Sequence, residues 1–114
     1  VTSTNSPASP PNSAFNAETL TPSISDLETP VITPTAANAQ LKFDIRYNTE
    51  ANYDGAVLEI KIGDGSFQDI LQAGGSFAAG EYNSEFATDS DNPIEGRRAW
   101  TGNSNGFVAA MVNL

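Results

Sequence analysis

The sequence contains no cysteine and no histidine among its 114 residues. Without cysteine, disulfide bonds and thiolate-based zinc or iron–sulfur sites are excluded. Without histidine, the chain lacks the usual general base, the commonest metal ligand and the side chain that titrates near neutral pH. The many serines have no imidazole to activate them, and both lysines fall on predicted strands. We therefore predict that the protein is not an enzyme.

Basic residues are also scarce: Lys and Arg number five against 14 acidic residues, which gives a net charge of −9. Such a chain repels phosphate backbones and anionic lipid headgroups, so we expect no nucleic-acid partner and no binding to a membrane surface. No apolar run approaches the roughly 20 residues of a membrane span, so we expect no membrane insertion either.

The low lysine content and the abundance of Asn, Thr, Ser and Gly are typical of secreted bacterial or archaeal surface proteins. We expect an extracellular or cell-surface location, although this composition leaves a cytosolic origin open. The chain begins at Val1 rather than at a methionine, which we interpret as a sign of processing or excision.

The clearest structural signal is a strict alternation of large apolar and charged residues over 41–47. Leu41, Phe43, Ile45 and Tyr47 alternate with Lys42, Asp44 and Arg46. This period of two is typical of a strand with one buried face. The pattern returns over 58–62, and we predict that the two runs pair as a hairpin across the polar loop 49–55. The glycines of 63–66 then predict a tight turn into a third strand over 67–70.

A sheet with one apolar face needs a second layer to cover it, so we predict an all-β, antiparallel, jelly-roll-like β-sandwich. Residues 1–22 are rich in Pro, Ser and Thr and predict an extended arm or linker. Residues 23–114 predict the sandwich domain. Within it, the prolines at both ends of 30–34 make 24–33 suitable for an edge strand.

The last third of the chain gives weaker signals. The glycine-rich stretch 71–82 predicts a long loop between the sheets. Residues 107–114 are apolar on both alternating faces and predict a strand that is covered on both sides. We expect no helix of useful length and no solenoid repeat.

Acidic side chains gather in two loops, one with Glu50 and Asp54 and the other over 85–95 with Asp89 and Asp91. Oxygen-rich loops of this kind hold hard cations such as calcium. The EF-hand pattern is absent, and a solvated acidic loop is the alternative. Glycoside hydrolysis by two of these carboxylates would need a fixed separation and a cleft, for which the sequence gives no argument.

The only tryptophan, Trp100, follows the only cluster of bases, Arg97 and Arg98. An aromatic platform beside a guanidinium is a common way to hold a sugar or a carboxylate, so Arg97 and Trp100 are the candidate ligand-binding residues. The alternative is structural: Trp100 packs over the end of the sandwich while an arginine pairs with an acidic residue.

A series of short motifs resembles a jelly-roll module of secreted bacterial proteins, similar to MAM domains and to modules that accompany proteases of the immune-inhibitor-A type. The motifs are Tyr53-Asp54-Gly55, 57–60, 65–70, 74–77, Tyr82-Asn83, Asn92-Pro93, Gly96-Arg97, Ala99-Trp100, 102–104, Gly106-Phe107 and 112–114. The resemblance covers roughly residues 11–114. It implies a non-catalytic extracellular β-sandwich, with calcium in some relatives at the loop that matches Glu50 to Asp54.

The chain departs from this family at three places. Ala56 and Glu81 stand where the family usually has glycine, and the family continues past Leu114 with further strands. We therefore expect the sandwich to be completed by further chain or by a strand from a neighbouring subunit, with the amino-terminal arm as one candidate donor.

Two functions follow as predictions. The first is a non-catalytic extracellular module for adhesion or binding, with glycans or other proteins as partners. The second is a structural protomer of an extracellular filament or complex, completed by strands from neighbouring subunits in a homo-oligomer or hetero-complex.

Overall fold

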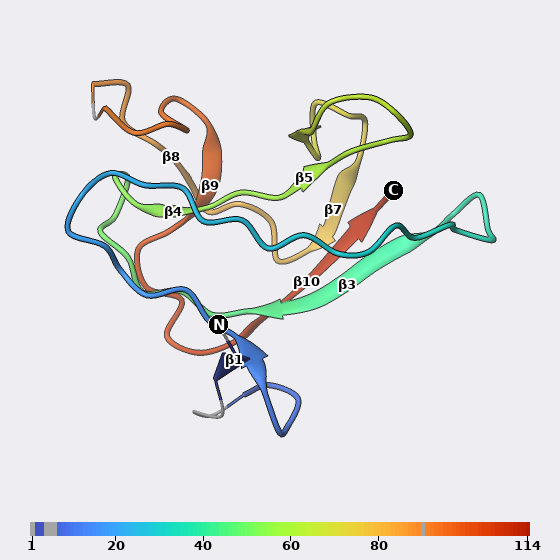
Figure 1. Ribbon diagram of the computed structural model, residues 1–114, viewed down its shortest axis with the longest axis horizontal. Coiled ribbons are helices and arrows are strands. Elements are labelled where there is room, and N and C mark those ends of the chain that lie inside the picture. The colour runs from blue at the N-terminus through green and yellow to red at the C-terminus, as the bar shows by residue number, and fades with distance from the viewer. Residues whose placement is uncertain (1, 4–6, 90) are drawn as a thin grey trace.

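The protein contains two three-stranded antiparallel sheets (Figure 1), and side chains from both meet in one core. The structure is a computed structural model that describes residues 2–3, 7–89 and 91–114. The first sheet has the order β3 (Gln40–Ile45), β10 (Val108–Asn113), β7 (Ser76–Ala79), and the second has the order β4 (Gly55–Ala56), β9 (Arg98–Thr101), β8 (Ser84–Glu85). Two small pairs complete the fold, β5 (Glu59–Ile60) with β6 (Gln68–Asp69) and β1 (Thr2–Ser3) with β2 (Ser13–Ala14). The predicted all-β, antiparallel fold is confirmed; its jelly-roll connectivity stays a prediction.

No helix occurs in the described parts of the chain. Accordingly, none of these residues belongs to a helix that could cross a bilayer.

The alternation in β3 correctly predicted which residues face the core. Leu41, Phe43 and Ile45 are half-buried and pack against the core cluster, whereas the residues between them are exposed. The predicted partner is wrong, however. β3 pairs with β10, with Phe43 opposite Ala110, rather than with the run that follows it in sequence. Alternation fixes the face of a strand but not its neighbour, and the chain crosses to the other sheet after Tyr47.

The second predicted hairpin is confirmed in shorter form. β5 and β6 pair with Glu59 opposite Asp69, and the intervening turn has Gly63 at a φ of 57°. The N–H of Gly65 donates to the Ile62 carbonyl and closes this turn. A positive φ is costly for residues with a Cβ, so glycine is the appropriate residue at position 63.

Trp100 is the centre of the core, with an exposed fraction of 2%. Its ring meets those of Phe43, Phe77 and Tyr82 edge-to-face, with centroids 4.8–5.8 Å apart. Both sheets and the β5–β6 pair contribute the surrounding apolar side chains. These are Ile70, Ala110 and Val112, which are buried, and Leu41, Ile45, Tyr47, Ala56, Leu58, Ile60 and Leu71, which are partly buried.

Close backbone contacts explain two glycines at the sheet edges. A Cβ on Gly80 would collide with the Ala109 carbonyl, and Gly80 also has a φ of 65°. A Cβ on Gly55 would collide with the Trp100 carbonyl across the β4–β9 pair. Glycine at both positions lets the backbones approach closely.

Three local predictions are wrong. Residues 24–33 contain no strand. The stretch 71–82 contains β7, because glycines flank a short segment whose Phe77 reaches the core. β10 is not covered on both sides: Ala109 is exposed and Met111 is half-buried, whereas Ala110 and Val112 are buried. Only one face of this sheet therefore meets the second layer.

Candidate binding surface

The structure places the two predicted ligand-binding residues in different surroundings. The Nε1–H of Trp100 donates to the carbonyls of Gly80 and Glu81, and its buried ring leaves no face open to a ligand. The side chain of Arg97 is 26% exposed and is engaged with two carboxylates. This is the packing described by the structural alternative, in which the tryptophan is core and the arginine pairs. Ligand binding by the pair stays a prediction that this packing does not support.

Arg97 belongs to a network built around Asp69. Its Nη2 lies 2.9 Å from Asp69 Oδ2, and its Nη1 lies 2.7 Å from Glu59 Oε1. The Tyr82 hydroxyl lies 3.2 Å from the same Asp69 oxygen, and the Leu71 N–H donates to the other one. Charge-assisted hydrogen bonds of this kind satisfy a buried carboxylate, so the network connects β5, β6 and the segment before β9.

Burial and these partners shift two pKa values. Burial raises the pKa of Tyr82 well above its ordinary value of 10.0, and the nearby Asp69 charge raises it further. Burial alone would lower the pKa of Arg97, but hydrogen bonds and charges from Asp69 and Glu59 outweigh burial and raise it. Both groups are therefore held in their protonated forms at neutral pH, which is unsuitable for a general base.

Thr101 closes the loop that contains Glu50 and Asp54, the predicted calcium ligands. Its Oγ1 lies 2.6 Å from the Asp54 carbonyl oxygen and 3.3 Å from that of Glu50, and it accepts the Asn52 N–H. Both acidic side chains are exposed. No cluster of three or more potential metal-ligating side chains occurs in the part of the chain that the structure describes. Calcium at Glu50 and Asp54 stays a prediction.

The most distinctive surface is the outer edge of β3. The Leu114 N–H donates to the Ala39 carbonyl, and the β3–β10 register continues from this pair. Successive residues of a strand direct their backbone N–H and C=O groups to opposite sides. The odd-numbered residues of β3 therefore bond to β10, whereas the backbone groups of Gln40, Lys42 and Asp44 point to the other side. No backbone partner lies on that side within the described ranges. β3 is thus an open edge strand.

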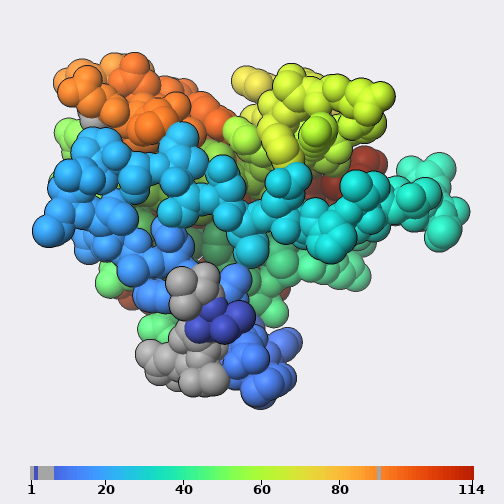
Figure 2. Space-filling view, viewed as in Figure 1, coloured from blue at the N-terminus to red at the C-terminus, as the bar shows by residue number. Residues whose placement is uncertain are grey.

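A segment of apolar residues precedes this edge in the sequence. Over residues 15–34, which contain no strand, Leu20, Leu27 and Val31 have exposed fractions of 105%, 81% and 98%. We call residues 15–34 the arm from here on, in place of the 1–22 predicted from the sequence; Figure 2 shows it, in blue to cyan, lying across the face of the molecule that is turned to the viewer. Soluble domains rarely leave such a concentration of large apolar side chains uncovered, which suggests a surface for association.

Charge distinguishes the arm from the edge. The chain has no base before Lys42, whereas the arm contains three acids, Glu18, Asp26 and Glu28. Lys42 and Arg46 have no ion-pair partner among the residues that the structure describes. Two unpaired bases therefore lie on and just after β3, in a chain that contains only five.

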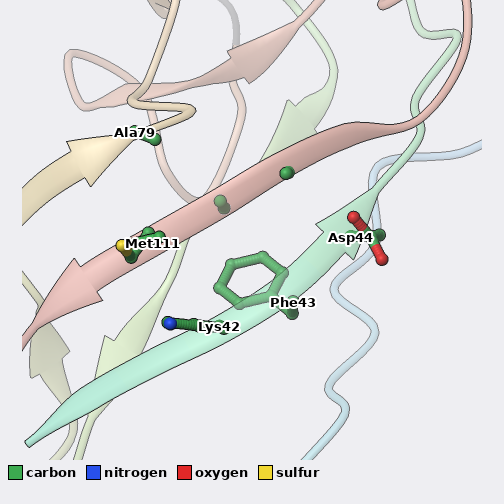
Figure 3. A pocket seen from close by; sticks show the side chains of 7 residues that line it. Lys42, Phe43, Asp44, Ala79 and Met111 are labelled. Carbon is green, nitrogen blue, oxygen red and sulfur yellow. The ribbon is translucent and has the colours of Figure 1, made fainter.

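The outer face of the β3–β10–β7 sheet has a depression beside this edge. A shallow hollow of about 200 Å³ lies there, and Figure 3 shows Lys42 and Asp44 on one side of it and Met111 on the other. Ala79 and Ala109 also line it, and their small side chains leave the space open.

A second groove, of about 370 Å³, lies where the arm joins β3. It is lined by 32–36 from the arm and turn, by 39–41 at the start of β3 and by Leu114. Residues 32–36, at the end of the arm, therefore lie near the start of β3, whereas Leu20 and Leu27 are exposed.

The sequence did not identify the open edge, because it assigned β3 a partner next to it along the chain. One signal was present: charged residues on a strand, lysine above all, are a common feature of edges. Compared with known proteins, the chain matches no family model, no curated protein and no solved structure. The resemblance to secreted jelly-roll modules stays a prediction.

Proposed function

We propose that this chain is a non-catalytic binding module of an extracellular protein, and that it binds an extended protein segment along the open edge of β3. The observation that carries the proposal is the outward backbone of Gln40, Lys42 and Asp44, which pairs with none of the residues that the structure describes. An extended segment that pairs with such an edge gains main-chain hydrogen bonds, and side-chain pockets give selectivity.

The chemistry of the remaining groups supports a non-catalytic role. The buried carboxylate of Asp69 is engaged by Arg97, Tyr82 and a backbone N–H. The sequence contains no histidine or cysteine that could act together with the exposed carboxylates in catalysis. A glycan partner has weaker support, because the predicted aromatic platform at Trp100 is buried.

A selection from a random peptide library displayed on phage tests this proposal. We expect enriched peptides of extended, β-prone sequence that bind the wild-type chain. Lys42→Pro should abolish their binding, because proline removes an N–H at the open edge and leaves the ladder to β10 intact. Lys42→Thr is the matched control, since it removes the same side chain but keeps the N–H. Failure to enrich peptides, or equal binding to Lys42→Pro, would contradict the proposal.

The structural-protomer function is favoured by a separate observation. The open edge and the exposed apolar arm belong to the same chain, so one molecule carries both a strand acceptor and a segment suited to donate a strand. Multiple copies of such a chain can assemble without any other partner.

A further inference from the structure

We infer that the segment bound by the β3 edge is residues 25–32 of a second copy of this chain, added as a parallel strand. This inference rests on the proposed function and names its partner. Three features of the chain lead to it: the position of Pro30, the faces of the arm and the placement of charge.

Pro30 determines which arm residues can bond to the edge. Proline has no N–H, so it is tolerated in a strand where its backbone points away from the neighbour. In an extended arm, Leu27, Thr29 and Val31 would then direct their N–H and C=O groups toward β3. The side chains of these three residues share one face, and those of Asp26 and Glu28 share the other.

The direction of the added strand follows from the side-chain faces. In a parallel pair, a residue that bonds to the neighbour lies beside a residue whose own backbone points away. Leu27 and Val31 would therefore lie in line with the half-buried Leu41 and Ile45 on the inner face. In an antiparallel pair with the same proline constraint, the apolar residues would share the solvent face and the acids would face the core.

Charge then selects the register. When Leu27 lies beside Leu41, Glu28 lies beside the unpaired Lys42, and no two carboxylates are opposed. Shifting the arm by two residues in one direction places Glu28 beside Asp44. Shifting it by two residues in the other direction places neither Asp26 nor Glu28 beside Lys42 or Arg46. Opposite charges side by side stabilise a sheet, and like charges destabilise it.

The chain's own arm cannot occupy this position. Only residues 33–39 connect the proposed donor segment to β3, and a parallel strand requires a connection of about a dozen residues or more. Residues 32–36 also line the groove at the end of the sheet, together with Leu114. The donor must therefore come from another molecule, which makes the contact head-to-tail and gives closed rings or open chains.

The test measures the solution mass of the intact chain and two complementary variants by sedimentation at about 0.15 M salt, where charges more than about 8 Å apart are screened. We expect the wild type to form concentration-dependent oligomers. Lys42→Pro removes the acceptor, and Leu27→Asp with Val31→Asp removes the donor; each should weaken self-association at least tenfold. Fluorescence of the buried Trp100 reports whether each variant is folded.

Mixing the two variants is the decisive step. The Lys42→Pro variant retains the arm, and the Leu27→Asp, Val31→Asp variant retains the edge. An equimolar mixture should therefore form a heterodimer and no larger oligomer. Pairing of two β3 edges with each other would leave the donor variant fully associated, and this result would overturn the inference. A charge exchange checks the register: Lys42→Glu should weaken assembly, and adding Glu28→Lys should restore it.

Cysteine pairing separates a second copy from the chain's own arm. The sequence has no cysteine, so Asp26→Cys with Gln40→Cys introduces the only thiols. Disulfide-linked oligomers are expected on oxidation, and a linked monomer would overturn the inference. If the wild type and the mixture stay monomeric while selected peptides still bind the edge, the self-association inference fails and the proposed function stands. If edge-binding peptides are absent as well, both fail.

Discussion

Val31 and Val112 have the same side chain, yet their exposed fractions are 98% and 0%. The arm around Val31 is as rich in large apolar residues as many strands, but it pairs with none of the strands that the structure describes. Val112 lies on β10, between β3 and β7, where its side chain joins the core. Apolar character alone therefore does not bury a segment. A partner for the backbone is also required.

The largest effect should come from the centre of the packed region. Trp100→Ala removes a buried ring that contacts three other aromatic rings, so we expect a loss of about 3–5 kcal/mol in the free energy of unfolding. Chemical denaturation followed by circular dichroism measures this loss. A loss below about 1 kcal/mol would mean that the two sheets do not enclose this residue.

Substitutions in the polar network around Arg97 should cost less free energy of unfolding. The size of the cost should depend on how deeply the substituted carboxylate is buried. Asp69→Asn should cost about 2–3 kcal/mol, because the Asp69 side chain is 9% exposed and Arg97 would lose a charged partner. Glu59→Gln is the matched control, since Glu59 contacts the same arginine but is 37% exposed. We expect it to cost less than about 1 kcal/mol in the same denaturation experiment. Equal losses would contradict the role assigned to burial.

High pH should weaken the packed region through Tyr82. Burial raises the pKa of Tyr82, so the folded state holds the phenol proton more tightly than the unfolded state does. This contribution is complete below about pH 10, the unfolded pKa, and is lost as the pH rises above it. Tyr82→Phe should cost about 1–2 kcal/mol at neutral pH and should show a shallower decline between pH 10 and 11. Parallel declines in melting temperature for both proteins would contradict this role of Tyr82.

Calcium would add a third region to the comparison. If Glu50 and Asp54 bind it, a tenfold excess over the dissociation constant should stabilise the chain by about 1.4 kcal/mol. A calorimetric melting curve with and without millimolar calcium measures the gain, and Asp54→Asn should remove it. An unchanged melting temperature on adding EDTA to calcium-treated protein would end the calcium prediction.

The smallest effect is expected in the arm. Val31→Ala should change the free energy of unfolding of the monomer by less than about 0.5 kcal/mol, because the side chain contacts solvent. Val112→Ala, the same substitution in β10, should cost about 1–3 kcal/mol. A large loss at Val31 in dilute, monomeric protein would mean that the arm packs on its own domain.

The sequence predicted the fold class and the inward residues of β3, since period-two alternation depends only on strand geometry. It could not predict that β3 pairs with β10, because pairing depends on contacts between residues more than 60 positions apart. The predicted edge strand over 24–33 has suitable residues but pairs with no strand that the structure describes. The sequence singled out Trp100 but could not distinguish a ligand platform from a core residue, because both use an aromatic ring.

Both proposals depend on the open edge of β3, and hydrogen exchange of individual amides measures whether this edge is unpaired. In the monomeric Leu27→Asp, Val31→Asp variant, we expect slow exchange at Phe43 and Ile45, whose N–H groups face β10, and fast exchange at Lys42 and Asp44. Adding the Lys42→Pro variant as an arm donor should slow exchange at Lys42 and Asp44. Uniformly slow exchange along β3 in the variant alone would show that its outer edge is already paired, and would contradict the account.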